Sequence, residues 1–169
     1  FYIAEMGASS GGDITDLCEM AQPEIGLITN ISEAHLEGFG SLEQIYRAKM
    51  ELGGYLSKRE GTLVYDADDE KFVYSAKVLY INQVTFGVKR KADFQLTAYE
   101  DEGDELKFSV NGSLSFRVPK FSVLNIKNAL AVLAVSDVCG LRISEIQTLF
   151  EKIQLPQGRF SIVRNGKGI

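Results

Sequence analysis

Short apolar runs alternate with segments of helical periodicity in the first third of the chain, and this alternation limits the possible folds more than any other feature. Residues 1–6, "FYIAEM", and residues 25–31, "IGLITNI", are typical of buried strands. Residues 61–69, "GTLVYDADD", are typical of a third strand with an acidic exit. Such alternation predicts an α/β fold, with a mainly parallel sheet flanked by helices.

Two helices are predicted between these strands. The first runs from about residue 13 to 21, follows the glycine- and serine-rich loop "GASSGG", and has Asp13 or Thr15 as its N-cap. The second covers residues 42–56, with Ser41 as its N-cap.

The pattern changes in the middle of the chain. From about residue 78 to 121 it becomes β-rich, and "YEDEGDE" and "VNGS" are hairpin signals, the second containing a strong Asn-Gly turn. We expect a small meander of three or four antiparallel strands there, forming a sublobe distinct from the opening βα layers.

Helical periodicity returns after the β-rich segment. One helix is predicted over residues 123–140, ending at Gly140, and another over 144–153, with Ser144 as its N-cap. Residues 159–169 are expected to form a further strand or hairpin.

Composition narrows the functional classes. The net charge of −5, with no cluster of Lys and Arg, argues against nucleic-acid binding. No apolar run approaches the length of a membrane span, so we expect no membrane insertion and a cytoplasmic location. Cys18 and Cys139 lie far apart without a CxxC spacing, and we interpret them as reduced core thiols. Oligomeric state is left open.

Lys49 occupies an unusual helical position. It lies four residues after Ile45 and three after Tyr46, and therefore on the apolar stripe of the predicted helix 42–56. Two interpretations stay open. The aliphatic stem packs on apolar surface with the ammonium reaching water, or the side chain points into a site, where a buried ammonium must be paired or chemically modified.

Glu5 and His35 both follow predicted strands. Open α/β sheets bind ligands beyond the carboxyl ends of their strands, so these two side chains are candidates for one shared site. A surface or capping role is the alternative for each. With a single His and no Cys cluster, a structural zinc site is nearly excluded, and the absence of a G-x-S-x-G elbow disfavours a serine triad.

Three further polar residues are candidates near the second half of the chain. Asn125 and Asn128 lie near a predicted helix start, either as an N-cap with a first-turn residue or as an amide pair that reads the edge of a heterocycle. Arg159 follows a Gly turn and is either a solvated loop residue or a phosphate ligand.

Taken in order, these segments resemble the ATP-dependent Mur ligases of peptidoglycan synthesis. The matching stretches are "AEMGAS", "PEIGLITNISEAHLEGFGSLEQIYRAKMEL", "LNIKNALAVLA" and "GRFSIV", which cover most of the chain outside the β-rich middle. The wording "EAHLEGFGS" is most similar to the branch of the family that adds D-alanyl-D-alanine to UDP-N-acetylmuramoyl-tripeptide.

The resemblance implies roles for the candidate residues. Residues 1–169 would be the central ATP-binding domain. Glu5, His35 and Lys49 would hold Mg²⁺, with Mn²⁺ as an alternative, and Lys49 would carry the carbamate common in the family. Asn125 and Asn128 would contact the adenine of ATP.

The resemblance also implies a phosphate contact and a reaction. Arg159 would contact phosphate. The full-length protein would form an amide bond through an acyl phosphate. Alternatives are a folylpolyglutamate synthase or cyanophycin-type relative, or a non-catalytic nucleotide-binding module. The third residue of the peptide substrate is not indicated.

Two departures from the family pattern bear on these expectations. Leu124 stands where the family usually has His, so the adenine contact depends on Asn125 and Asn128. No GTxGKT-type phosphate loop occurs in the 169 residues, and "RNGKGI" lacks its spacing. We therefore expect a central domain incomplete at both ends, without the phosphate loop and without the N- and C-terminal domains.

Because backbone N–H groups of that loop cradle the phosphates of ATP, the isolated 169 residues are expected not to catalyse ATP-dependent ligation. A product assay on the isolated chain tests this expectation, and robust amide formation would contradict it.

Overall fold

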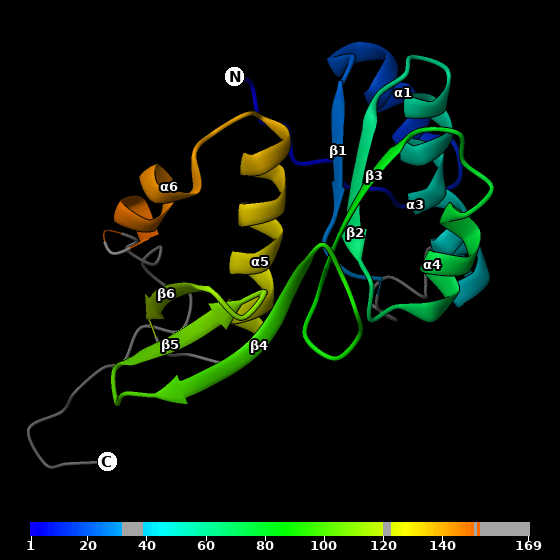
Figure 1. The fold of residues 1–169 in the computed structure, drawn as a ribbon. Helices are drawn as coiled ribbons and strands as arrows, with labels where there is room; N and C mark the ends of the chain where they lie inside the picture. The colour runs from blue at the N-terminus through cyan, green and yellow to red at the C-terminus, as the bar shows by residue number, and fades with distance from the viewer. Residues whose placement is uncertain (32–38, 120–122, 151, 153–169) are drawn as a thin grey trace, which may run out of the picture.

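The computed structural model describes residues 1–31, 39–119, 123–150 and 152. Its helices and strands, labelled as in Figure 1, follow one another in the order α1 (Asp13–Ala21), β1 (Ile25–Ile28), α3 (Leu42–Ser57), β2 (Thr62–Asp66), α4 (Glu70–Ala76), β3 (Asn82–Gly87), β4 (Phe94–Asp101), β5 (Glu105–Val110), β6 (Leu114–Pro119), α5 (Val123–Val138) and α6 (Ile143–Phe150).

One six-stranded sheet runs through the molecule in the order β1-β2-β3-β4-β5-β6. The first three strands are parallel, with Thr62 of β2 opposite Ile25 of β1 and Asn82 of β3. A short parallel contact joins β3 to β4, and β4, β5 and β6 then pair antiparallel. The α/β fold expected from the sequence, a mainly parallel sheet with a small antiparallel meander, is therefore confirmed.

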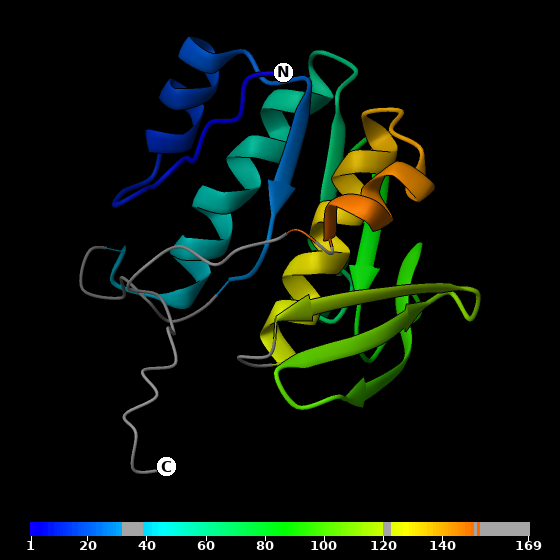
Figure 2. The same cartoon turned by 90° about the vertical axis from the view of Figure 1, so that its left-hand side faces the viewer.

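Helices cover both faces of the parallel strands (Figures 1 and 2). On one face, α3 and α4 bury a cluster that includes Leu56, Leu63 and Phe72. On the other face, α5 and α6 pack over a larger cluster that includes Val64 and Phe86 and continues onto the antiparallel strands. Adjacent residues of β2 thus point into different cores, which is the period of a strand buried on both faces.

The β-rich segment differs from its prediction at its start. Residues 82–87 form β3, which belongs to the parallel sheet and not to an antiparallel meander, so the meander has three strands. The cause is α4, a helix that the sequence analysis missed and that supplies the crossover parallel strands need. Its signal was present, since Asp69 before "EKFVYSA" is a strong N-cap.

Both predicted hairpins of the meander are confirmed. The Asn-Gly turn between β5 and β6 has Asn111 at φ 53° and Gly112 at φ 76°, the left-handed pair that a tight hairpin turn requires. Asp101–Glu105 closes the other hairpin through Gly103, whose φ is 88°.

The strand predicted at residues 1–6 is wrong. These residues are irregular, and the side chains of Phe1, Tyr2 and Ile3 are exposed. A strand needs a neighbour for its backbone hydrogen bonds, and within the described residues β1 pairs only with β2. Glu5 was expected at the end of a strand, but it lies in an exposed, irregular segment before α1.

The longer helices follow the sequence. Ser41 caps α3 as predicted, accepting from Gln44 N at 3.3 Å. Gly26 lets this helix lie close to β1, since a Cβ at residue 26 would come within 2.8 Å of the Leu52 and Leu56 side chains.

The α5 and α6 predictions hold in outline. Gly140, with φ 76°, follows α5 as expected. The Ser144 cap is wrong, because α6 already begins at Ile143. The strand or hairpin predicted for residues 159–169 lies outside the described residues. In the segments that are described, no helix is long and apolar enough to cross a membrane.

Both cysteines are free thiols, as expected, but only one is in a core. Cys18 is fully buried beside α3, and Cys139 is half-buried at the end of α5. Burial is the main factor that raises the pKa of the Cys18 thiol, with the Glu51 carboxylate adding to it.

The start of α1 is held by a side chain from another helix. Gly12 is the N-cap and carries no side chain, so neither Asp13 nor Thr15 caps the helix as predicted. Glu51 of α3 replaces a local cap, with Oε1 accepting from Gly12 N at 2.7 Å and Oε2 from Thr15 N at 3.0 Å. Asp13 instead closes the preceding loop, and hydrogen bonds, chiefly from Ser9 N, lower the pKa of Asp13 to about 2.

Replacement of Glu51 by Ala leaves the first N–H groups of α1 without a carboxylate acceptor. We expect the Glu51→Ala variant to lose about 1–2 kcal/mol of unfolding free energy, the cost of losing a helix cap, measured by urea denaturation. Glu24→Ala, an exposed carboxylate before β1, is the matched control. Equal stability of the two variants would contradict the capping role.

Candidate functional site

The carboxyl ends of the three parallel strands meet at one edge of the sheet. A small hollow lies there, lined by Ile28, Asn30, Ile31, Asp66, Asp69 and Phe72. It is formed by the residues that end or follow β1 and β2 and by the first turns of α4. Ligands of open α/β sheets bind beyond the carboxyl ends of the strands, so this edge is the candidate site.

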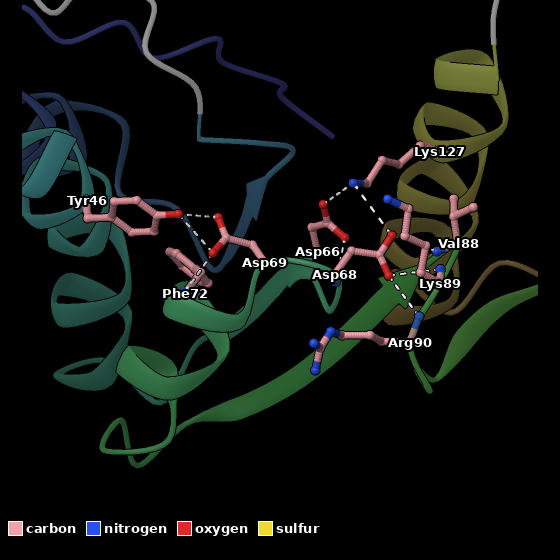
Figure 3. Close-up of polar contacts among 9 residues, drawn as sticks. All are labelled: Tyr46, Asp66, Asp68, Asp69, Phe72, Val88, Lys89, Arg90 and Lys127. Atoms are coloured by element: carbon pink, nitrogen blue, oxygen red, sulfur yellow. Dashed lines mark hydrogen bonds and ion pairs between the residues drawn. The ribbon is translucent and has the colours of Figure 1, made fainter.

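The exit of β2, "DADD", fills this edge with carboxylates (Figure 3). Asp66 is 6% exposed and is the one charged side chain that is buried among the described residues. Its Oδ1 accepts from Asp68 N at 2.9 Å, and its Oδ2 forms an ion pair with Lys127 of α5. The Lys127 ammonium also lies 3.7 Å from Asp68 Oδ2.

Asp68 holds the loop that follows β3. Its carboxylate accepts from the backbone N–H groups of residues 88–90 at 3.0, 2.9 and 2.9 Å. Burial acts to raise the pKa of Asp68, but these three donors and the Lys127 ammonium outweigh it, so the pKa lies below its ordinary value. Gly87 permits this approach, because a Cβ there would be 3.2 Å from Asp68 Oδ1 and 3.1 Å from Arg90 O.

Asp69 joins two helices at the other end of the same turn (Figure 3). It caps α4 by accepting from Phe72 N at 2.9 Å. The Tyr46 hydroxyl of α3 donates to the same carboxylate at 2.9 and 2.7 Å. Burial first, and then the hydrogen bond and charge of Asp69, raise the pKa of Tyr46 to about 12.

The two asparagines lie on the first turns of α5. Neither is an N-cap, because the helix begins at Val123. Asn125 is half-buried and donates through Nδ2 to Pro119 O at 3.2 Å, which ties the helix to the end of β6. Asn128 is exposed, and no hydrogen bond between described residues occupies its amide. Of these two asparagines, therefore, only Asn128 keeps both its amide N–H group and its carbonyl oxygen without a hydrogen bond to another described residue.

Lys49 and Glu5 are both described, but they are not brought together by any contact. Lys49 is half-buried on α3, on the same face as the buried Ile45 and Tyr46, as its register predicts. No ion pair between described residues involves Lys49, and no hydrogen bond or ion pair there joins it to Glu5.

His35 and Arg159 lie outside the described residues. Within those residues, no three His, Cys, Asp or Glu side chains gather as metal ligands. The metal set of Glu5, His35 and Lys49 stays a prediction, as does the phosphate contact of Arg159.

Sequence reasoning missed the polar network of the β2 exit. "DADD" was recognised only as an acidic end to the strand, and Lys127 was not singled out. A signal existed for part of it: Asp69 precedes a helical pattern, and a carboxylate at the end of a central strand needs a cationic or N–H partner. The partner itself comes from α5, about sixty residues further on, which the pattern does not reveal.

Replacement of Tyr46 by Phe removes the hydroxyl that bonds Asp69. We expect the Tyr46→Phe variant to lose about 2 kcal/mol of unfolding free energy near neutral pH, because the hydrogen bond is made to a charged acceptor. The pKa of Tyr46 is higher in the folded state, so this contribution is complete below the unfolded value of about 10 and is lost as pH rises toward about 12.

Urea denaturation at neutral and alkaline pH, with tyrosinate absorbance titration, measures both effects. Tyr74→Phe, at a tyrosine that is 77% exposed, is the control and is expected to change neither. A Tyr46→Phe variant with the stability of this control would show that the bond to Asp69 contributes nothing.

Comparison with known proteins identifies the family of this chain. The family described as "Mur ligase middle domain" matches residues 1–136. The UDP-N-acetylmuramoyl-tripeptide–D-alanyl-D-alanine ligase of Rickettsia prowazekii is 31% identical over 96% of this chain and 38% of its own length. The Bacillus subtilis enzyme of the same name is 28% identical over 99% of this chain and 36% of its own.

A solved structure leads to the same family. The structure of MurF ligase from Thermotoga maritima in complex with ADP is 27% identical, with a TM-score of 0.83, and the match covers 95% of this chain and 37% of that one. The chain thus spans little more than a third of the length of these relatives. With the family model matching most of its residues, the chain belongs to the Mur ligase family through that family's middle domain.

Proposed function

We propose that this chain is the ATP-binding part of a ligase that adds D-alanyl-D-alanine to UDP-N-acetylmuramoyl-tripeptide in peptidoglycan precursor synthesis. The relatives from Rickettsia prowazekii and Bacillus subtilis are named for that reaction, and each matches almost the whole of this chain. The Thermotoga maritima relative was solved with ADP bound. These names favour this reaction over the folylpolyglutamate-synthase and non-catalytic alternatives.

The observation that carries the proposal is the carboxyl-end hollow beside the start of α5. Its walls come from β1, β2 and α4, and Lys127 links it directly to the helix that presents Asn128. An exposed amide offers one donor group and one acceptor, the pair needed to read the edge of an adenine. We place the nucleotide base at the start of α5, with Asn125 supporting this turn through Pro119.

The proposed reaction has two steps. A carboxylate oxygen of the tripeptide substrate attacks the γ-phosphorus of ATP, and the bond to ADP breaks, leaving an acyl phosphate. The amine of D-alanyl-D-alanine then attacks the acyl carbon, phosphate leaves, and the amine loses a proton as the amide forms. In such a reaction, the protein contributes mainly positioning and charge neutralisation.

Lys49 fits the metal role that the family resemblance gives it. A half-buried amine without an ion pair in the described part of the chain is free to add to CO₂ and lose a proton, which gives a carbamate. Carbamate and carboxylate oxygens are ligands that Mg²⁺ prefers, and the exposed Glu5 supplies the second kind. Glu5, His35 and a carbamylated Lys49 would hold the ion, which when bound neutralises phosphate charge.

The cytoplasmic location expected from the sequence is part of the same proposal. The proposed reaction consumes ATP and a UDP-linked precursor, so the enzyme would have to work where both are present.

The direct test is a ligation assay on the full polypeptide that contains this chain. With ATP, D-alanyl-D-alanine and UDP-N-acetylmuramoyl-tripeptide, we expect stoichiometric formation of ADP, phosphate and the extended peptide. Formation of ADP without the amide, or ligation of glutamate to a folate in its place, would overturn the proposal.

The Lys49 role is tested with two substitutions in that polypeptide. Lys49→Met and Lys49→Arg are both expected to lower the ligation rate about a hundredfold, because neither side chain supplies carbamate oxygens. Lys58→Met, at the C-cap of the same helix, is the control. Substantial activity in Lys49→Arg alone would mean that a positive charge is what the site requires, contradicting the carbamate.

A further inference from the structure

Lys127 connects two parts of the molecule that are far apart in the sequence. It belongs to the second turn of α5, between Asn125 and Asn128, and its side chain is 24% exposed. Its ammonium pairs with Asp66 at the end of β2 and lies 3.7 Å from Asp68 (Figure 3). The neighbouring Asn125 makes a different contact: its Nδ2 donates to Pro119 O, at the end of β6.

The ion pair between Lys127 and Asp66 neutralises charge in a poorly hydrated part of the molecule. Asp66 and Asp68 have side chains that are only 7% and 11% exposed, so neither carboxylate is well hydrated. Asp66 has one further donor, the backbone N–H of Asp68. Without Lys127, two carboxylates in one turn would face each other with no cation between them, which a poorly hydrated environment penalises strongly.

Lys127 has no acidic partner in the first turn of its own helix, since α5 carries no Asp or Glu there. The ion pair with Asp66 at the end of β2 is therefore the interaction that holds the Lys127 ammonium in place. Through it, a side-chain contact joins the carboxyl-end turn to the first turns of α5.

We infer that Lys127 is a positioning residue for nucleotide binding, which fixes Asn128 of α5 relative to the carboxyl-end hollow by pairing with Asp66. This inference rests on the proposed function, in that Asn128 is taken to contact the adenine. Lys127 itself is not assigned a contact with the nucleotide. Its effect passes chiefly through the Asp66 carboxylate, so substitution of either partner is expected to weaken nucleotide binding.

The experiment compares variants in the full polypeptide that contains this chain. Asp66→Asn, Lys127→Met, the corresponding double variant and the conservative Lys127→Arg probe the pair. Lys107→Met, on β5, removes an equivalent charge from the more exposed pair with Glu100 and is the matched control. ATP affinity is measured by calorimetry at a temperature where each variant is folded, and amide hydrogen exchange is measured without nucleotide.

A positioning role predicts coupled effects. Each single variant of the pair is expected to bind ATP about fivefold more weakly, and the double variant no more weakly than either single one. Lys127→Arg should retain most of the affinity, and Lys107→Met all of it. Amides of residues 125–131 should exchange faster in Lys127→Met and in Asp66→Asn, but not in the control.

Two results would overturn the inference. Weaker ATP binding in Lys127→Met with unchanged binding in Asp66→Asn would show that Lys127 does not act through Asp66. Lower melting temperatures with unchanged ATP affinity and unchanged exchange of residues 125–131 would make the pair a stability element only.

Failure of the proposed function has a different signature. A wild-type protein that does not bind ATP, or an Asn128→Ala variant that binds it as tightly as wild type, would remove the assigned nucleotide contact. If Asn128→Ala weakens binding while both variants of the ion pair bind ATP normally, the site is right and the positioning role of Lys127 is wrong.

Discussion

The four-residue turn that ends β2 is the constraint on which the arrangement of this edge depends. Each of its three carboxylates binds a different part of the molecule: Asp66 pairs with α5, Asp68 holds the loop after β3, and Asp69 caps α4 and accepts from α3. Acidic side chains this close repel one another unless each has its own donors. The fold supplies those donors, and in doing so it joins α3, α4, α5 and the loop after β3 to the end of β2.

The buried position of the Asp66–Lys127 ion pair raises the question of what the pair contributes, since apolar residues could fill the same space. A buried ion pair is weak evidence for stability, since apolar residues of similar size often serve as well, whereas loss of one partner is costly. We therefore infer that the Asp66–Lys127 pair contributes more to the position of the first turns of α5, where the two asparagines lie, than to the free energy of unfolding.

The sequence predicted the elements whose signals are local. The periodicity of apolar residues predicted the helices α3 and α5 and the strands β1 and β2. The Ser41 N-cap marked the start of α3, and turn residues such as Asn111–Gly112 predicted both hairpins. Two of the errors have a non-local cause. Residues 1–6 have the composition of a strand but no partner in the described sheet, and α1 is capped from α3 by Glu51.

The candidate site was predicted less completely than the fold. The edge of the sheet and the asparagines of α5 were candidates from the sequence, because strand ends and helix starts are visible there, and their roles in binding stay predictions. Lys127 and its carboxylate partners were not, because only the folded chain brings residue 127 to residue 66. The parallel placement of β3 was missed for a related reason, since the seven-residue helix α4 had to be recognised first.

We propose that the base of ATP lies against the first turns of α5, beside the carboxyl ends of the parallel strands. Photo-crosslinking of the full polypeptide with an azido-adenine analogue of ATP, followed by peptide mass spectrometry, tests this placement. Label is expected on the peptide that contains Asn125 and Asn128, and excess ATP should abolish it. ATP-sensitive label confined to the β4–β6 hairpins, or to the face formed by α1 and α3, would contradict it.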